Sequence, residues 1–231
     1  MSTGASLLWI IVPYVAMAVF VVGHWWRYRT DQFAWTSRST QLLDRSVLGW
    51  ASPMFHYGAL AAVGGHLIGL CIPPSLTASI GITEGFYRWF AGIAGGIAGL
   101  VTLAGFLGLV YRRATSDRVR RTTTQMDMLT YLLLTVLIVL GCWMTFSHTL
   151  ITSHAYNYRD TIAIWWRSLF YLHPNVSAAA GAPLVYQLHA IIAWAFWAAF
   201  PFSRLVHAWS IPIQFVGRPY ILYRRRYQTA R

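Results

Sequence analysis

Four histidines lie within two long apolar runs of this 231-residue chain. An ionisable side chain in an apolar segment is energetically costly and usually has a partner. Neutral imidazole is a common metal ligand and an axial ligand of haem iron. The four are His56 and His66 in the run 48–72, and His189 and His207 in the run 183–209. Their two-and-two placement predicts that they bind two haems.

Bis-histidine ligation limits what such haems can do. Two histidines fill both axial positions of one iron and leave no position for oxygen or substrate, so we expect electron carriers. Gly58, Gly64, Gly65 and Gly69 lie near the first two histidines and would leave space for flat macrocycles. We interpret the remaining histidines, which are His24, His148, His154 and His173, as solvated or interfacial. Among them His148 is the main rival as a ligand of the outer haem.

The composition is that of a membrane protein. Apolar residues make up 57% of the chain and charged residues only 10%, which is too apolar for an ordinary soluble domain. The formal net charge of +12 could suggest nucleic acid, but nearly all arginines lie in connections between apolar runs, so we expect no nucleic-acid partner. Cys71 and Cys142 form no C-x-x-C motif and predict no iron–sulfur or zinc site of the chain's own.

Five apolar runs are long enough to cross about 30 Å of hydrocarbon. Each exceeds the length of a strand, so we predict an all-α, integral membrane five-helix bundle. We interpret the first run as a retained span and not as a removed signal peptide. A shorter aromatic-rich stretch, 162–172, predicts an outer interfacial helix, with Trp165, Trp166 and Tyr171 at the headgroup level. The predicted spans are about 6–26, 48–72, 89–111, 125–147 and 183–209.

The arginines predict the orientation of the bundle. They concentrate in the first and third connections and in the tail 210–231, which therefore belong on the cytoplasmic side. The N-terminus is then outside and the C-terminus inside, and the protein is a multi-pass membrane protein in contact with lipid.

Orientation also predicts which histidines share an iron. His56 and His207 come out near the inner face, and His66 and His189 near the outer face. Along a continuous helix, His56 and His66 would be about 15 Å apart, and His189 and His207 would be about 27 Å apart. We expect tilt and a bend at Pro201, whose ring disrupts helical hydrogen bonding, to reconcile the two distances.

Haem propionates are anionic and need donors at the membrane interface. The candidates at the inner face are Arg112, Arg204 and Tyr28. Snorkelling to lipid headgroups is an equally good interpretation of these side chains.

Seven short motifs closely resemble the gamma subunit, a diheme cytochrome b, of respiratory nitrate reductase. The resemblance covers nearly the whole chain, and the last motif is the most specific. The motifs are Leu43-Asp-Arg45, Phe55-His-Tyr-Gly58, Gly65-His66, Phe90-Ala-Gly92, Arg118-Val-Arg-Arg-Thr-Thr-Thr124, Leu188-His189 and Phe200-Pro-Phe-Ser-Arg-Leu-Val-His-Ala-Trp-Ser-Ile-Pro212.

This resemblance implies the membrane anchor and quinol-dehydrogenase subunit of a larger enzyme. Quinol would be oxidised near the outer haem b, with protons released outside. Electrons would pass through the inner haem b to an iron–sulfur subunit and a molybdenum catalytic subunit on the cytoplasmic side, where nitrate is reduced. The resemblance gives His66 and His189 as outer ligands and His56 and His207 as inner ligands, in agreement with the predicted depths.

The sequence departs from the family pattern at one position that bears on quinol binding. One member of the family has a lysine just before its third span that is implicated in quinol binding. Gapless alignment puts Glu84 of this chain there, with Arg88 about one helical turn later. Gly65, His66, Glu84 and Arg88 are therefore the candidates for the quinol site, with menaquinol or ubiquinol as substrate. Glu84 would act there as a proton acceptor or, equally, be a solvated loop acid.

Two alternatives remain open from sequence. The first is a cytochrome b anchor of a sulfur-compound or heterodisulfide reductase, since the acceptor is reduced by another polypeptide. The second is a transporter without haem that uses its histidines as a proton relay. The lack of Asp or Glu near the centres of the spans disfavours the transporter.

Overall fold

The fold is given by a computed structural model that describes residues 4, 7–151, 156–209 and 217. All regular elements among these residues are helical. His154 lies outside the described residues. The predicted tail after residue 209 also lies outside them, except for Gly217.

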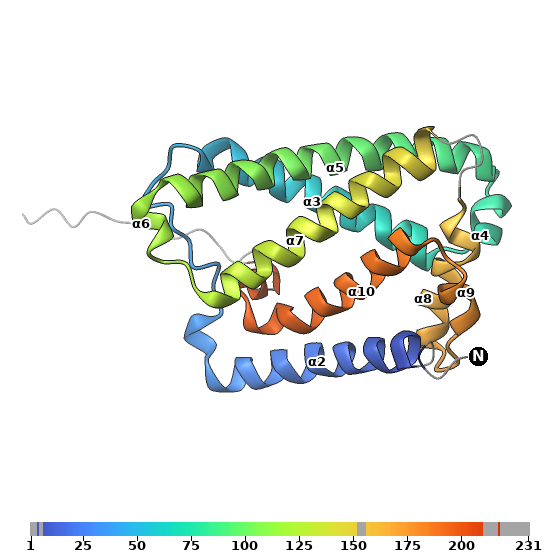
Figure 1. The fold of residues 1–231 in the computed structure, drawn as a ribbon, viewed down its shortest axis with the longest axis horizontal. Coiled ribbons are helices and arrows are strands. Elements are labelled where there is room, and N and C mark those ends of the chain that lie inside the picture. The colour runs from blue at the N-terminus through green and yellow to red at the C-terminus, as the bar shows by residue number, and fades with distance from the viewer. Residues whose placement is uncertain (1–3, 5–6, 152–155, 210–216, 218–231) are drawn as a thin grey trace, which may run out of the picture.

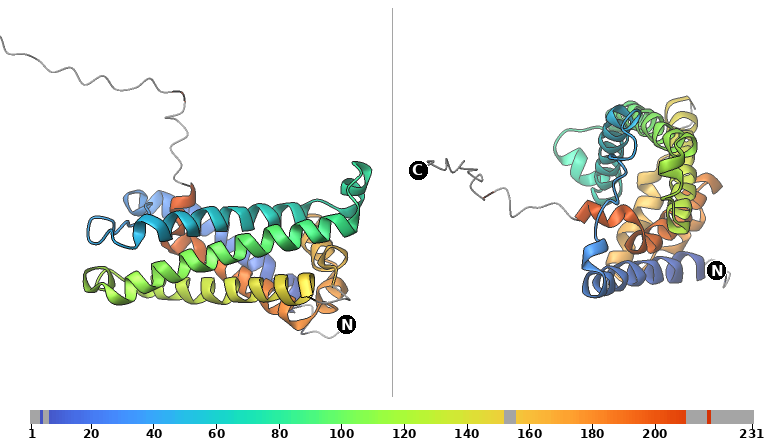
Figure 2. Two further views of the ribbon diagram at one scale, coloured as in Figure 1. Left: turned by 90° about the horizontal axis from the view of Figure 1, so that it is seen from above. Right: turned by 90° about the vertical axis from the view of Figure 1, so that its left-hand side faces the viewer.

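Five long helices form a bundle, as predicted. Each has a window of 18 residues that is apolar enough to cross a membrane. Successive long helices run in opposite directions along the long axis of the molecule (Figures 1 and 2). They are η1 (Leu7–Ile11) with α2 (Val12–Thr30), α3 (Leu48–Cys71), α5 (Glu84–Thr115), α7 (Gln125–Trp143) with the π-helix η3 (Met144–Ile151), and α10 (Leu184–Ala199).

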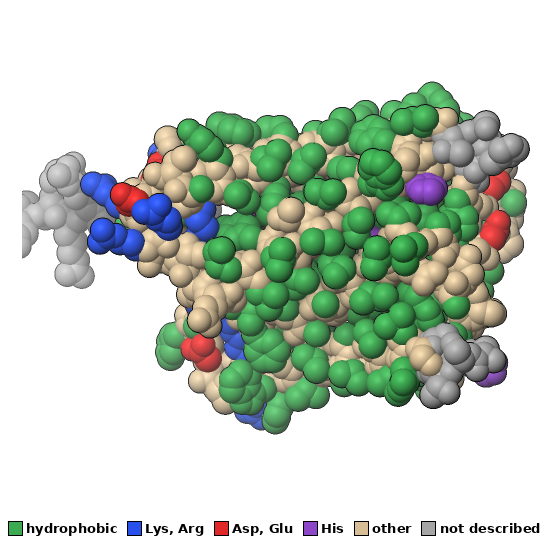
Figure 3. Space-filling model, in the orientation of Figure 1, with side chains coloured by type: hydrophobic (Ala, Val, Ile, Leu, Met, Phe, Trp, Pro, Cys, Tyr) green, Lys and Arg blue, Asp and Glu red, His purple; other side chains and the backbone are tan. Residues whose placement is uncertain are grey.

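Short helices occupy the two ends of the bundle. We call the end with the α2–α3 and α5–α7 connections the inner end, and the end with α4, α8 and α9 the outer end, after the predicted orientation. Arginine side chains gather at the inner end, while hydrophobic side chains cover the middle (Figure 3). The short helices are η2 (Gln32–Ala34), α4 (Pro74–Ser79), α6 (Asp117–Arg120), η4 (Tyr158–Asp160), α8 (Ile162–Phe170), α9 (Val176–Ala180), η5 (Phe200–Phe202) and η6 (Arg204–Trp209).

The third long helix extends beyond the predicted apolar run at both ends. Hydropathy detects only the apolar part, whereas capping fixes the helix termini. At the start of α5 the Thr83 hydroxyl accepts a hydrogen bond from the Phe86 amide, and Glu84 lies in the first turn. Arg112 and Arg113 lie in the last turn, where cations are favourable. The polar residues at both ends thus belong to the helix.

The fifth predicted span is interrupted, where the sequence predicted only a bend. The α-helix ends at Ala199, and two short 3₁₀-helices follow, η5 and η6, separated by Ser203 in an extended conformation (φ −97°, ψ 176°). Pro201 has no N–H to continue the helix. The freed carbonyl groups have a donor: Nη1 of Arg27 lies 2.6 Å from the Pro201 oxygen and 2.7 Å from the Ser203 oxygen.

Helix α8 contributes to the protein interior. Trp165 is only 1% exposed, and its indole Nε1 donates to the main-chain oxygen of Trp9 at 3.0 Å. Their rings also meet edge to face, with centroids 5.2 Å apart. The short helix predicted at the interface is therefore present, but one side of it packs against η1 and does not lie free at the headgroup level.

Glycines let α5 approach its neighbours closely. Gly92 lies against Leu150 of η3 and Gly99 lies against Cys142 of α7, so these glycines serve helix packing. The closest approach lies further along α5, where a Cβ on Gly105 would meet the backbone of Ala51 and Phe55 on α3. Small residues at such positions bring membrane helices into contact.

Replacing Gly105 by Ala should destabilise the bundle by about 1–3 kcal/mol, because the added methyl meets backbone and not a flexible side chain. Thermal unfolding in detergent measures this loss. Gly95→Ala on the same helix is the matched control, since its nearest neighbour would be the Thr145 methyl at 3.9 Å. Equal midpoints for the two variants would contradict the close approach of α3 and α5.

Candidate functional site

The structure brings the four histidines together in the two predicted pairs. His66 on α3 faces His189 on α10, with ring centroids 6.1 Å apart and ring planes at 9°. His56 on α3 faces His207 on η6, with centroids 6.0 Å apart and planes at 72°. Because η6 follows the interruption of the fifth span, His207 does not sit 27 Å along a continuous helix from His189. The interruption thus removes the mismatch in helical spacing.

The ring orientation of three histidines is set by main-chain carbonyl groups. Nδ1 lies 2.7 Å from the Ser52 oxygen in His56, 2.7 Å from the Ala62 oxygen in His66 and 2.6 Å from the Arg204 oxygen in His207. A carbonyl oxygen only accepts, so Nδ1 carries the proton and Nε2 keeps its lone pair for a metal. In His189, Nδ1 is buried and has no hydrogen-bond partner among the described residues.

The distances between the paired rings fit ligation of one iron by two imidazoles. With metal–nitrogen bonds of about 2.0 Å, two opposed rings have centroids roughly 6 Å apart. A direct hydrogen bond between two imidazoles would instead bring the centroids to roughly 5 Å. Within the described part of the chain no cluster of three or more His, Cys, Asp or Glu could hold a metal ion. Haem needs no such cluster, because its porphyrin supplies four ligands.

The glycines beside the first two histidines divide into two kinds. A Cβ on Gly64 or Gly65 would meet no atom within 4 Å, so these positions have the space expected beside a flat macrocycle. Gly58 instead lies against Thr102, and Gly69 lies against the hydroxyl of Tyr158. The last two glycines serve packing of the protein itself.

The inner candidate donors for propionates already have protein partners. Arg112 donates to the Thr40 side chain and to the main-chain oxygens of Thr40 and Asp44, at 2.5–3.2 Å. Arg204 binds both carboxylate oxygens of Asp127, at 2.8 and 2.7 Å. Tyr28 is 57% exposed. Arg112 is therefore a support for the α2–α3 connection, and a propionate role for these side chains stays a prediction.

Two inner residues that sequence reasoning did not single out are central here. Arg27 is 4% exposed and binds the interrupted fifth span, and Asp127 is 2% exposed and binds Arg204. Asp127 carries a usable sequence signal, because Thr124 precedes it by three residues in a capping box at the start of α7. For Arg27 the sequence offers only an arginine at a helix end.

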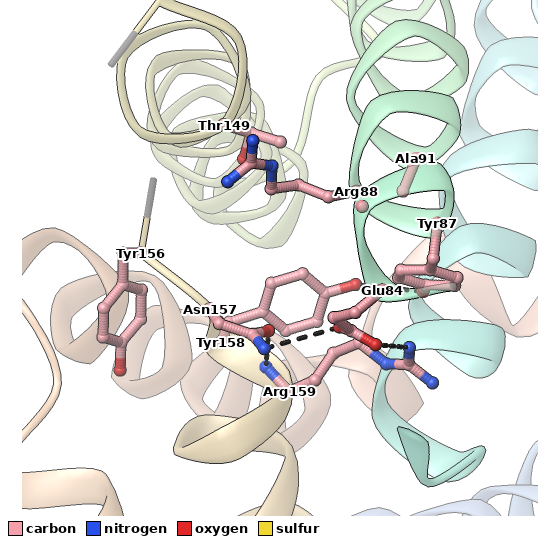
Figure 4. A pocket seen from close by; sticks show the side chains of 10 residues that line it. Glu84, Tyr87, Arg88, Ala91, Thr149, Tyr156, Asn157, Tyr158 and Arg159 are labelled. Carbon is pink, nitrogen blue, oxygen red and sulfur yellow. Dashed lines mark hydrogen bonds and ion pairs between the residues drawn. The ribbon is translucent and has the colours of Figure 1, made fainter. Parts of the chain in front are cut away.

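A cavity of about 200 Å³ lies at the outer end, between α5, η3 and η4 (Figure 4). Glu84 and Arg88 line it, but Gly65 and His66 do not. Tyr87 lines both this cavity and an apolar groove of about 370 Å³ beside α3 and α4, whose other lining residues include Ile68, Ile72, Phe86 and Phe90. The cavity therefore collects two of the four quinol candidates and shares the lining residue Tyr87 with the apolar groove.

Arg159 organises the wall of this cavity. Its side chain is 1% exposed, and its Nη1 lies 2.8 Å from Oε2 of Glu84. Its Nη2 donates to the Ile72 main-chain oxygen and to the Thr77 hydroxyl, each at 3.2 Å, and its guanidinium lies over the Tyr87 ring at 3.9 Å. Arg159 thus joins η4 to the ends of α3, α4 and α5, and Glu84 is its ion-pair partner and not an isolated loop acid.

The remaining polar groups of the cavity differ in whether they have hydrogen-bond partners. The hydroxyls of Tyr87 and Tyr158 lie 3.2 Å apart. Burial raises the pKa of Tyr158, and its hydrogen bond with Tyr87 raises it further, so this phenol stays protonated. Arg88 extends toward Thr149 (Figure 4), and its guanidinium makes no hydrogen bond or ion pair with the described residues.

Among the described residues, the other three histidines do not face a further histidine across the bundle. His148, the expected rival, lies in η3 with its ring against Tyr186 at 5.8 Å. The Nδ1 atom of His24 bonds the Phe20 main-chain oxygen at 2.6 Å, and its ring lies among aromatic rings. His173 is exposed.

Replacing Arg159 by Gln should destabilise the outer end by about 2–4 kcal/mol, because Glu84 and the acceptors of α3 and α4 lose a buried cation. Thermal unfolding in detergent measures the change. Arg88→Gln is the matched control, with an expected effect of about 0.5 kcal/mol or less. Similar losses in the two variants would contradict a special role for Arg159.

Comparison with known proteins assigns the family. Residues 5–226 match the family described as nitrate reductase gamma subunit. The nitrate reductase gamma chain of Bacillus subtilis is 39% identical over 96% of this chain and 98% of its own length. The respiratory nitrate reductase 1 gamma chain of Escherichia coli is 34% identical over 94% of this chain and 96% of its own length. The nitrate reductase-like protein NarX of Mycobacterium tuberculosis H37Rv is 49% identical over 96% of this chain, which spans only 34% of that relative. The chain, with its five apolar helices and two facing histidine pairs, belongs to the nitrate reductase gamma subunit family.

Proposed function

We propose that the chain is the diheme cytochrome b subunit of a respiratory nitrate reductase, and that it oxidises quinol at the membrane. The observation that carries the proposal is the pair of opposed histidine couples, with ring centroids 6.0 and 6.1 Å apart at two levels of the bundle. The family assignment supports it independently. When bound, two haems would supply one-electron carriage between the two ends of the bundle.

The four histidines perform the binding step. His66 and His189 would hold the outer haem b, and His56 and His207 the inner one. Three of the four rings are oriented by carbonyl acceptors, which keeps Nε2 unprotonated and directed away from the helix that carries it. With two histidines holding each haem, the iron would have no ligand position left for substrate, so the site would suit electron transfer and not bond chemistry.

The outer cavity is the proposed quinol site. Quinol has two hydroxyl groups and an isoprenoid tail, and the cavity joins polar side chains to an apolar groove through Tyr87. Arg88 and the phenol of Tyr158 offer donors to the quinol oxygens. Glu84 offers a carboxylate for a proton, held in place by Arg159. His66 and Gly65 would be its neighbours on the haem side. The substrate would be menaquinol or ubiquinol.

The inner end is the proposed docking end for the partners. An iron–sulfur subunit and a molybdenum catalytic subunit would bind there on the cytoplasmic side of a prokaryotic cytoplasmic membrane. The arginines of the inner connections support this orientation. Oxidation of quinol releases two protons and two electrons, and reduction of nitrate to nitrite and water consumes two of each. The protons would leave at the outer end.

The histidine-relay transporter fits the geometry less well. A proton relay needs rings in hydrogen-bond contact, and the observed centroid distances are about 1 Å longer than that contact gives. The sulfur-compound or heterodisulfide reductase anchor has no separate observation in its favour, whereas two of the three relatives named above are nitrate reductase gamma chains.

The haem content of the purified chain tests the proposal. We expect two b-type haems per chain in a pyridine haemochrome assay, and one in His66→Ala, which lacks an outer ligand. The same variant should lose quinol-driven nitrate reduction by the complex, while an artificial donor that reduces the partner subunits directly should still work. His173→Ala, an exposed histidine, is the matched control and should keep both haems. A well-folded wild-type chain without haem, despite adequate haem supply, would falsify the proposal.

Replacing Arg88 by Ala should raise the KM for quinol by about tenfold, the equivalent of one charge-assisted hydrogen bond of roughly 1.4 kcal/mol. Haem content and artificial-donor activity should not change. Steady-state kinetics with a soluble quinol analogue measure the effect. Arg167→Ala serves as the control, because Arg167 bonds the Leu70 oxygen and does not line the cavity. An unchanged KM in Arg88→Ala would remove Arg88 from the site.

A further inference from the structure

His207 is the one proposed ligand that lies outside a long helix. Its segment, η6, follows the extended residue Ser203, so the hydrogen bonds of α10 do not fix its position. Within η6, the ring Nδ1 of His207 donates to the main-chain oxygen of Arg204 at 2.6 Å. The direction of the imidazole therefore depends on where the peptide group of Arg204 lies.

The side chain of Arg204 is anchored on another helix. Its Nε lies 2.8 Å from Oδ1 of Asp127, and its Nη2 lies 2.7 Å from Oδ2. Such a two-point contact between a planar guanidinium and a carboxylate fixes direction as well as distance. Asp127 is 2% exposed and Arg204 has a side chain 18% exposed, so water competes little for the pair.

Asp127 is itself held in the first turn of α7. Its amide donates to the hydroxyl of Thr124 at 3.2 Å, and its Oδ2 accepts from the Thr124 amide at 3.0 Å. The carboxylate therefore has a fixed place in the bundle. A continuous chain of contacts leads from the backbone of α7 through Asp127 and Arg204 to the ring of His207, which faces His56.

We propose that Asp127 is a positioning residue for the inner haem ligand His207 and acts through Arg204. This inference rests on the proposed function, because it assumes that His207 and His56 bind a haem. The effect is specific to the inner pair. His66 and His189 both lie inside long α-helices, where the helix backbone sets their positions.

The test compares three variants of the full chain in its membrane: Asp127→Asn, Arg204→Gln and the double variant. Haem content and the low-temperature EPR spectrum of the oxidised haems are measured, with the inner and outer signals assigned from His56→Ala and His66→Ala. We expect each single variant to lose the inner haem, so that content falls from two to about one per chain, or to keep it with a shifted inner signal. The outer signal should not change. The double variant should be no worse than either single one, since both remove the same link.

Two controls separate positioning from other effects. Asp117→Asn removes an exposed ion pair with Arg120 at the same end of the bundle and should leave both haem signals unchanged. Thr124→Ala removes the hydroxyl acceptor of the capping box but leaves the contacts of Asp127 with Arg204. It should lower the thermal midpoint without shifting the inner signal.

Several results would overturn the proposal. One is an inner haem signal in Asp127→Asn that equals that of Asp117→Asn. Another is loss of the outer haem as well, which would make Asp127 a general packing residue. A purely electrostatic role would shift the inner midpoint potential in opposite directions in Asp127→Asn and Arg204→Gln and leave the EPR signal unchanged. Absence of haem from the wild-type chain would instead be a failure of the proposed function.

Discussion

The interruption of the fifth span depends on Arg27. A helix that stops near the membrane interface frees main-chain carbonyl groups, and each unsatisfied polar group there costs several kcal/mol. The guanidinium of Arg27 donates hydrogen bonds to the carbonyl oxygens of Pro201, Ser203 and Ala34. These bonds satisfy the carbonyl groups at the interruption and connect α2 to it. Without this contact the chain would have no low-energy way to turn after α10. This change of direction after α10 brings His207 opposite His56.

The two ends of the bundle use buried arginines in the same way. At the inner end Arg112 binds carbonyls of the α2–α3 connection, and Arg204 binds Asp127. At the outer end Arg159 binds Glu84 and the carbonyl of Ile72. In each case a planar cation with several donors joins a connection or short helix to a long helix. The apolar middle is held by close helix packing instead, as at Gly105.

The sequence was sufficient for the bundle and for the histidine pairs, but not for the polar contacts that support them. Apolar runs of span length and arginine placement depend on local composition, and the order of His56, His66, His189 and His207 along antiparallel spans fixes which two meet. Arg159 and Asp127 have partners 75 and 77 residues away, and no local pattern specifies such a contact. The span ends were also missed, because hydropathy does not register a helix that continues through polar residues or stops at Pro201 within apolar ones.

Glu84 changes the electrostatics of the outer cavity relative to the lysine that the sequence resemblance implies at this position. A lysine beside Arg159 would bring two cations together, and burial makes such a contact unfavourable. With Glu84 the buried charge of Arg159 is neutralised at 2.8 Å, and the cationic group left to face the cavity is that of Arg88. One helical turn separates the two positions on α5, so a positive group can reach much the same space from either. The departure at Glu84 is therefore compatible with a retained cation in the cavity, shifted by one turn and balanced by an ion pair behind it.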